Sequence, residues 1–86
     1  MIKLITANGI EFEISWIGVA SIDGVLRFGV INSTLSEVIN TFTNPENCTV
    51  LTRNYDGVIE TFEGFTVFRG ISINFKGEMI VALSKI

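Results

Sequence analysis

The sequence predicts an α+β domain that is mainly antiparallel β, a small barrel or sandwich of about seven strands with one short helix, in the order βββ-α-ββββ. Asn-Gly and Asp-Gly dipeptides, which favour hairpin turns because type I′ turns need positive φ, divide the apolar and β-branched runs. A capping-box pattern marks a single helix in the middle. The turn signals are Asn8-Gly9, Asp23-Gly24, Asp56-Gly57 and a similar break at Lys76-Gly77.

The first hairpin is expected to pair Ile2–Thr6 with Ile10–Trp16. A three-residue loop with Gly9 as a bulge places side chains of the same kind on the same face, whereas a two-residue loop mixes them. The favoured register therefore sets Leu4 opposite Phe12, Ile2 opposite Ile14 and Lys3 opposite Glu13.

A two-residue loop at Asp23-Gly24 predicts the second hairpin. Its expected core face pairs Val19 with Phe28, Ile17 with Val30 and Ser21 with Leu26. Its other face pairs Gly18 with Gly29, Ala20 with Arg27 and Trp16 with Ile31. Paired glycines would let another backbone or side chain approach closely, and a strain-relieving bend of the sheet is the alternative reading.

The helix is expected to begin after Thr34, with Glu37 completing the capping box, and to end at Asn44-Pro45. Four apolar residues at helical spacing should face the sheet. They are Leu35, Val38, Ile39 and Phe42.

Four strands follow the helix. The hairpin of Thr49–Tyr55 with Val58–Glu63 should pair Leu51 with Phe62, Thr52 with Thr61, Arg53 with Glu60 and Tyr55 with Val58. A long strand over Phe65–Phe75, bent at Gly70, should then pair with Glu78–Lys85. In that last strand Met79, Val81 and Leu83 line one face.

Length and composition fit a single domain, residues 1–86, with more apolar residues than one small core needs. Hydrophobic residues make up 48% and charged residues only 17% of the chain, against about 25% charged in typical domains. Burial against a partner explains the surplus, and an efficient closed barrel covered by the helix is the alternative.

Charge and cysteine usage exclude several classes of function. The net charge is −3 and no basic stripe exists, so no nucleic-acid partner is expected. No apolar run approaches the ~18 residues of a membrane span, so no membrane partner is expected either. Asn8-Gly9 interrupts the N-terminal apolar run too early for a secretory signal, and Cys48 is the only cysteine. A cytoplasmic location is the expectation.

The residues also argue against an enzyme. The chain has no histidine, Cys48 has no histidine partner, and Glu11 with Glu13 fits simple alternation on a solvated strand face. Residues 52–63 resemble a calcium-loop spacing, but Thr52 stands where the first ligand must be acidic and strands flank the segment. No catalytic residue, cofactor or metal is expected.

The strongest functional indication is apolar surface on both faces of some strands. Phe65 and Phe68 fall on opposite faces, so one of them should point away from the core. The candidate interface residues are Trp16, Gly18, Gly29, Ile31, Phe65 and Phe68.

The layout resembles small β-rich proteins encoded in phage and prophage tail regions, and the sheet-plus-helix plan is similar to the tail-tube and baseplate fold lineage. The matching segments are the Asp-Gly turn within residues 22–26, the helix at 37–42, the Thr-Asn-Pro break at 43–45 and Glu63-Gly64-Phe65-Thr66. This resemblance implies a structural protein without catalytic residues, incorporated in a virion.

The expected function is therefore a non-enzymatic structural or protein-interaction module, a phage-tail accessory that forms homo-oligomers or binds other assembly subunits. The alternative is a small β-barrel that binds a ligand at its mouth. A buried apolar pocket lined by Trp16 or Phe68 would favour ligand binding. A flat apolar face with unpaired strand edges would favour assembly.

Overall fold

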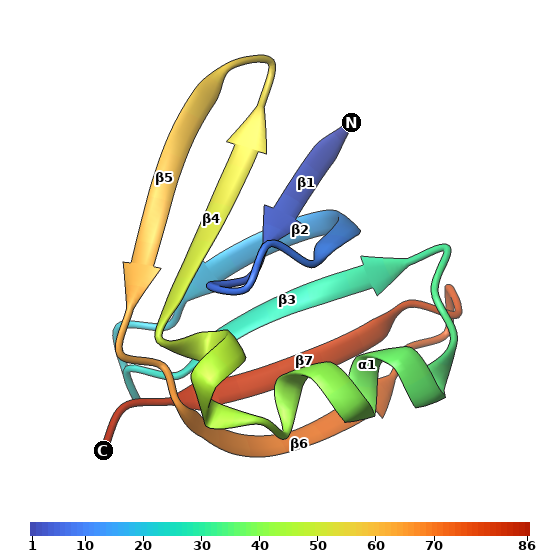
Figure 1. Ribbon diagram of the computed structural model, residues 1–86. Helices are drawn as coiled ribbons and strands as arrows, with labels where there is room; N and C mark the ends of the chain where they lie inside the picture. The colour runs from blue at the N-terminus through green and yellow to red at the C-terminus, as the bar shows by residue number, and fades with distance from the viewer.

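The computed structural model describes residues 1–86 as one seven-stranded antiparallel sheet with the strand order β5-β4-β1-β2-β3-β7-β6 and a helix on one face (Figure 1). The predicted fold class and element order are confirmed. The sheet is not closed, because its two end strands, β5 and β6, each pair with a neighbour on one side only. The elements are β1 (Ile2–Ile5), β2 (Glu11–Val19), β3 (Leu26–Ile31), α1 (Leu35–Phe42), the 3-10 helix η1 (Pro45–Cys48), β4 (Val50–Tyr55), β5 (Val58–Glu63), β6 (Val67–Ile73) and β7 (Met79–Ser84).

The sheet curls around a single hydrophobic core, which makes it an open barrel. Strands β4 and β5 stand steeply to β3, β7 and β6 (Figure 1). Phe62 near one end of the sheet and Leu83 near the other belong to the same cluster of buried side chains as Val38 and Phe42 of α1. We call the face that carries this core the inner face, and the opposite face the outer face.

The predicted register of the first hairpin is confirmed, with Leu4 opposite Phe12, Ile2 opposite Ile14 and Lys3 opposite Glu13. Gly9 has a φ of 83°, as the three-residue loop requires. Lys3 forms an ion pair with Glu11 and not with Glu13, the residue opposite it. Lys3 Nζ lies 3.2 Å from Glu11 Oε1.

The predicted register of the second hairpin is wrong by two residues. Trp16, not Gly18, lies opposite Gly29, and Val19 lies opposite Leu26. The loop is longer than two residues, since the Ala20 N–H donates to the Val25 carbonyl at 3.1 Å. Asp23 stabilises this wider loop by accepting a hydrogen bond from the Val25 N–H at 3.0 Å.

The longer loop is the physical reason for the difference, because it changes the pairs next to the turn, and a bulge in β2 shifts the register by one more residue beyond them. The register shifts between Ile14 and Trp16, so the extra residue exchanges the two faces of the strand. Phe12 and Ile14 point inward before the bulge, and Ile17 packs against the core after it. In β2, even-numbered residues therefore face the core before the bulge, and odd-numbered residues face it after the bulge.

Helix α1 begins as predicted but buries a narrower stripe. The Thr34 hydroxyl accepts from the Glu37 N–H at 3.2 Å and the Glu37 carboxylate accepts from the Thr34 N–H at 3.3 Å, which confirms the capping box. Val38 and Phe42 are buried, whereas Leu35 and Ile39 are exposed, contrary to the prediction. Thr41 is buried instead, because Asn47 of η1 donates to the Thr41 carbonyl at 2.9 Å and holds this side of the helix.

Replacement of Thr34 by alanine is expected to lower the free energy of unfolding by about 1 kcal/mol, because the Glu37 N–H loses its acceptor. Urea denaturation followed by circular dichroism measures the change. Ser36→Ala, within the same exposed turn, is the control and should leave the midpoint nearly unchanged. Equal midpoints for Thr34→Ala and the wild type would contradict the capping role.

The two C-terminal hairpins follow the sequence closely. All four predicted pairs between β4 and β5 are present, and Arg53 Nη2 lies 3.3 Å from Glu60 Oε1. The predicted bend of β6 is present as a bulge between Phe68 and Gly70, where Gly70 has a φ of 131°. Met79, Val81 and Leu83 are buried, as predicted.

Candidate functional site

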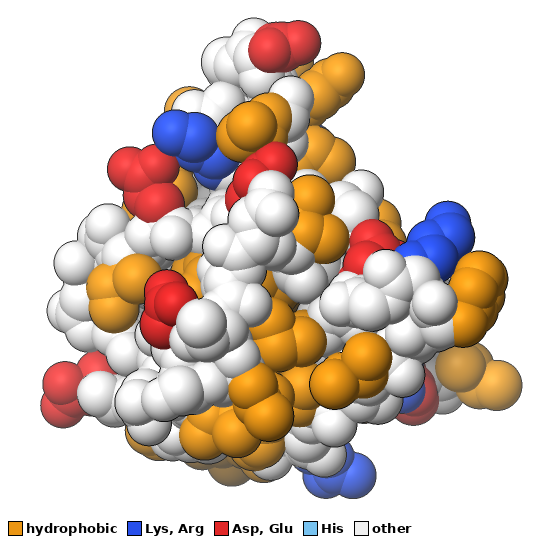
Figure 2. Space-filling view, turned by 90° about the vertical axis from the view of Figure 1, so that its right-hand side faces the viewer, with side chains coloured by type: hydrophobic (Ala, Val, Ile, Leu, Met, Phe, Trp, Pro, Cys, Tyr) orange, Lys and Arg blue, Asp and Glu red, His pale blue; other side chains and the backbone are white.

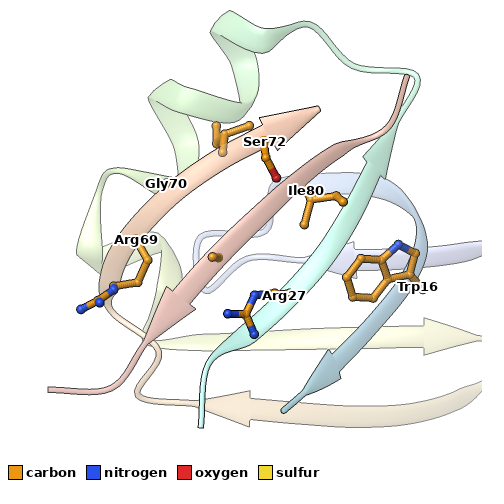
Figure 3. Close-up of a pocket in the computed structure, with 8 residues that line it drawn as sticks. Trp16, Arg27, Arg69, Gly70, Ser72 and Ile80 are labelled. Carbon is orange, nitrogen blue, oxygen red and sulfur yellow. The ribbon is translucent and has the colours of Figure 1, made fainter. Parts of the chain in front are cut away.

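The outer face of β2, β3, β7 and β6 carries a shallow groove, on the side of the sheet opposite α1 (Figure 3). It consists of two adjoining hollows of about 420 and 550 Å³ that share Arg27, Arg69 and Ala82. We call this feature the outer groove. Its other lining residues are Trp16, Gly70, Ile71, Ser72 and Ile80 in one hollow, and Asp23, Val25 and Ser84 in the other.

Small residues create the groove. Gly29 lies opposite Trp16, and a Cβ atom added to Gly29 would lie only 2.8 Å from Trp16 Nε1. The indole ring therefore packs directly against the backbone of β3 at Gly29. Ala82 of β7 lies opposite Arg27 of β3 on one side and opposite Gly70 of β6 on the other. Because Ala82 and Gly70 are small, the sheet surface is recessed in the middle of the groove.

Two arginines from different strands line both hollows. In Figure 3 the Arg69 side chain extends outward from β6 at the edge of the sheet, and β7 separates it from Arg27. Arg27 Nη2 donates to Asp23 Oδ2 at 3.0 Å, an exposed pair within the hairpin. The hydrogen bond from Arg27 and that from the Val25 N–H hold the pKa of Asp23 below its ordinary value. Arg69 lies in the β6 bulge, is exposed, and has no ion-pair or hydrogen-bond partner in the protein.

The structure brings together only part of the predicted interface. Trp16 lines the outer groove, Gly29 lies beneath it, and Gly18 is on the same face opposite Arg27. The predicted pairing of Gly18 with Gly29 is absent because the loop of this hairpin is longer than the predicted two residues. Ile31 lies away from the groove, opposite Glu13 and partly buried.

Phe65 and Phe68 correct a further expectation, because neither points away from the core. Phe65 is 5% exposed and belongs to the core cluster. It lies in the connection from β5 to β6 and not in a strand, so strand alternation does not apply to it. Phe68 is partly buried against the core, opposite Leu83.

Sequence reasoning did not find Arg27 and Arg69 as site residues. They line the same groove only because β7 inserts between β3 and β6, an arrangement that the order of elements along the chain does not reveal. The one available signal was Gly70 next to Arg69, since a glycine inside a strand often marks a bulge.

Cys48 has the environment of a structural thiol. It is fully buried, and burial raises its pKa to about 11, so the thiol is protonated at neutral pH. Its Sγ lies 3.7 Å from the Phe42 carbonyl oxygen. The structure brings no three His, Cys, Asp or Glu side chains together as metal ligands.

Addition of calcium is expected to leave the thermal midpoint unchanged, because residues 52–63 form a hairpin. The Asn54 side chain, at a position that resembles a calcium ligand, already accepts a hydrogen bond from the Gly57 N–H at 3.1 Å. Differential scanning fluorimetry with calcium or magnesium measures the midpoint. A midpoint that rises with calcium but not with magnesium would show a native-state calcium site.

The two free edges of the sheet differ in regularity. The edge at β6 is interrupted by the bulge that carries Arg69. The edge at β5 pairs regularly with β4 over six residues, without proline, lysine or a bulge. Val58 and Ile59, on opposite faces of β5, are 61% and 62% exposed. We call this strand, Val58–Glu63, the β5 edge.

Exposed hydrophobic side chains are also widespread elsewhere. Figure 2 shows them in a band down the middle of one face, with most of the charged side chains toward its margins. The largest exposures away from the chain ends are those of Ile22 and Phe75, each in a loop that joins two strands.

None of the helices is both long and apolar enough to cross a membrane. Comparison with protein-family models, curated proteins and solved structures found no match to this chain. The proposal for its function therefore rests on its own surfaces.

Proposed function

We propose that this protein is a non-enzymatic structural module that self-associates, with the β5 edge of one copy pairing with the β5 edge of another. The observation that carries the proposal is the regular, unpaired edge of β5, with the apolar side chains of Val58 and Ile59 exposed beside Glu60 and Glu63. An exposed edge strand presents a row of free backbone donors and acceptors that a second strand can satisfy.

Hairpin geometry identifies which backbone groups are free. Tyr55 and Val58 flank the two-residue turn and form a hydrogen-bonded pair, so hydrogen-bonded and non-hydrogen-bonded pairs alternate from there. Ile59 and Thr61 lie opposite Asn54 and Thr52 in the non-hydrogen-bonded pairs. Their N–H and C=O groups therefore point away from β4, toward the free edge.

In a symmetric antiparallel pair of two β5 strands, one position of the two-fold axis is favoured. A two-fold axis perpendicular to the sheet keeps inner faces together and sets each residue opposite one of the same face. Centring the pair on Glu60 would oppose two carboxylates, which is unfavourable. Centring it on Thr61 opposes two hydroxyl side chains and brings Phe62 of each copy opposite Glu60 of the other.

The alternative of a ligand-binding barrel has less support. Fifteen side chains fill the barrel interior, and both hollows of the molecule are on its outer face. Trp16 lines an open groove and Phe68 packs against the core, so neither lines a buried pocket. A phage-tail assembly is the setting that we propose for the module, on the resemblance described above.

Thr61→Pro tests the proposal. Proline removes the outward N–H of β5 without removing a bond to β4, so the monomer should keep its fold while pairing at the edge is lost. Light scattering of the wild type at micromolar concentration should give twice the 9.5 kDa mass of one chain. Thr61→Pro should give the mass of one chain, with an unchanged circular dichroism spectrum.

Ile73→Pro is the matched control, since Ile73 is an exposed residue of the opposite edge strand. Its N–H also points outward, because Ile73 lies next to the hydrogen-bonded Asn74 and Glu78. This variant should remain a dimer. A wild type that is monomeric over a wide concentration range, or a Thr61→Pro variant that dimerises like the wild type, would overturn the proposal.

A further inference from the structure

The outer groove combines an apolar half and a cationic half. The side chains of Trp16 and Ile80 form the apolar part of the first hollow, while Arg27 and Arg69 line both hollows (Figure 3). Ligand sites commonly join apolar walls to a few polar groups that fix orientation. The groove has this composition on a face of the sheet that nothing else covers.

The free polar groups of the groove are mainly hydrogen-bond donors. Arg69 has no partner, and the Trp16 indole N–H makes no hydrogen bond within the protein. Asp23 is the only acidic lining residue, and its carboxylate already accepts from Arg27 and from the Val25 N–H. Arg27, Arg69 and Asp23 together carry a net positive charge, although the whole chain has a net charge of −3.

We propose that the outer groove binds an acidic peptide segment, with carboxylates on Arg69 and Arg27 and a neighbouring large apolar side chain against Trp16 and Ile80. Guanidinium groups bind carboxylates through two parallel hydrogen bonds, which favours arginine at such a site. This site is distinct from the β5 edge, which lies at the other end of the sheet. The inference therefore does not depend on self-association.

The dimensions of the groove fit a short extended chain. It crosses β2, β3, β7 and β6, and three strand spacings of about 4.8 Å give a length of about 14 Å. An extended peptide covers this distance with about four or five residues. The apolar and cationic halves lie side by side along it, so a carboxylate and a large apolar side chain on neighbouring residues can reach both.

The fluorescence of Trp16, the only tryptophan, reports binding directly. The probe is the peptide acetyl-Leu-Glu-Phe-Glu-Leu-amide, and the matched control probe has Gln in place of each Glu. The acidic peptide should change the Trp16 emission in a saturable manner, and its affinity should fall between 0.05 and 0.5 M salt. The Gln peptide should bind at least about tenfold more weakly, because it lacks the charge-assisted bonds.

Arg69→Gln removes the unpartnered guanidinium and should weaken binding of the acidic peptide by about tenfold or more. Lys76→Gln is the matched control, because it changes the net charge equally in the β6–β7 turn, outside the groove. It should bind within about twofold of the wild type. Neither side chain is buried, so both variants should fold.

Three results would overturn the assignment. The first is no emission change with the acidic peptide up to millimolar concentration. The second is equal affinity of Arg69→Gln and the wild type. The third is an equal response to inorganic phosphate or to a single-stranded oligonucleotide, which would show a general anion site instead of a peptide site.

Discussion

Replacement of Phe42 by alanine is expected to lower the free energy of unfolding by about 3–5 kcal/mol, because its side chain is fully buried at the centre of the core. The ring centroids of Phe12 and Phe28 each lie 5.0 Å from that of Phe42. The substitution therefore removes two aromatic contacts and leaves a cavity between α1 and the sheet. A domain of this size has little stability to spare, so the variant should be close to unfolding at room temperature.

Urea denaturation followed by circular dichroism measures this loss, and Ile39→Ala is the matched control. Ile39 lies on the same helix but is exposed, so its truncation should cost less than about 1 kcal/mol. If Phe42→Ala lowers the free energy of unfolding much more than Ile39→Ala, the helix buries the narrower stripe that the structure shows. Similar losses would fit the wider stripe predicted from the sequence, in which Ile39 also faces the sheet. Equal midpoints for Phe42→Ala and Ile39→Ala would show that α1 packs differently from the structure.

Hairpins with short loops could be predicted from the sequence down to single pairs. In the β4–β5 hairpin, the Asp56-Gly57 turn and the match of like residues across the strands both favour one register, and the structure has that register. The first hairpin was equally predictable, because only the three-residue loop puts Leu4 opposite Phe12. Local geometry and face matching agree in both cases.

The second hairpin could not be predicted in the same way. Asp23-Gly24 suggests a tight turn, but here it lies within a wider loop that a side chain of the loop stabilises. The bulge after Ile14 is also hidden, because apolar residues occupy both alternation patterns of β2. Where both faces of a strand read as apolar, hydrophobic pattern alone does not fix the register.

The surfaces proposed to be functional were less predictable than the fold. Trp16 could be identified as an apolar residue on the face of the second hairpin opposite the expected core, and it lines the outer groove. Arg27 and Arg69 could not, since the groove depends on which strands become neighbours in space. The β5 edge follows from the same spatial order, which puts β5 at one end of the sheet.

Replacement of Gly29 by alanine is the second change with a large expected effect, about 1–3 kcal/mol of destabilisation through overpacking. The added Cβ would lie 2.8 Å from Ser15 Oγ and 2.8 Å from Trp16 Nε1. The Ser15 hydroxyl can rotate away, but the rigid indole must leave its position against β3. The emission of Trp16 should therefore change together with the stability, and the outer groove should lose its apolar wall.

Gly18→Ala and a double-mutant cycle separate this contact from a general effect of alanine. A Cβ atom at Gly18, on the same outer face, would meet no atom within 4 Å, so Gly18→Ala should be neutral or slightly stabilising. In a Trp16→Ala background the clash with the indole is gone, and Gly29→Ala should then cost much less than in the wild type. An equal cost of Gly29→Ala in both backgrounds would mean that the indole does not lie against Gly29. The wall of the outer groove would then be misplaced, because its position depends on this one close approach between a glycine and a tryptophan.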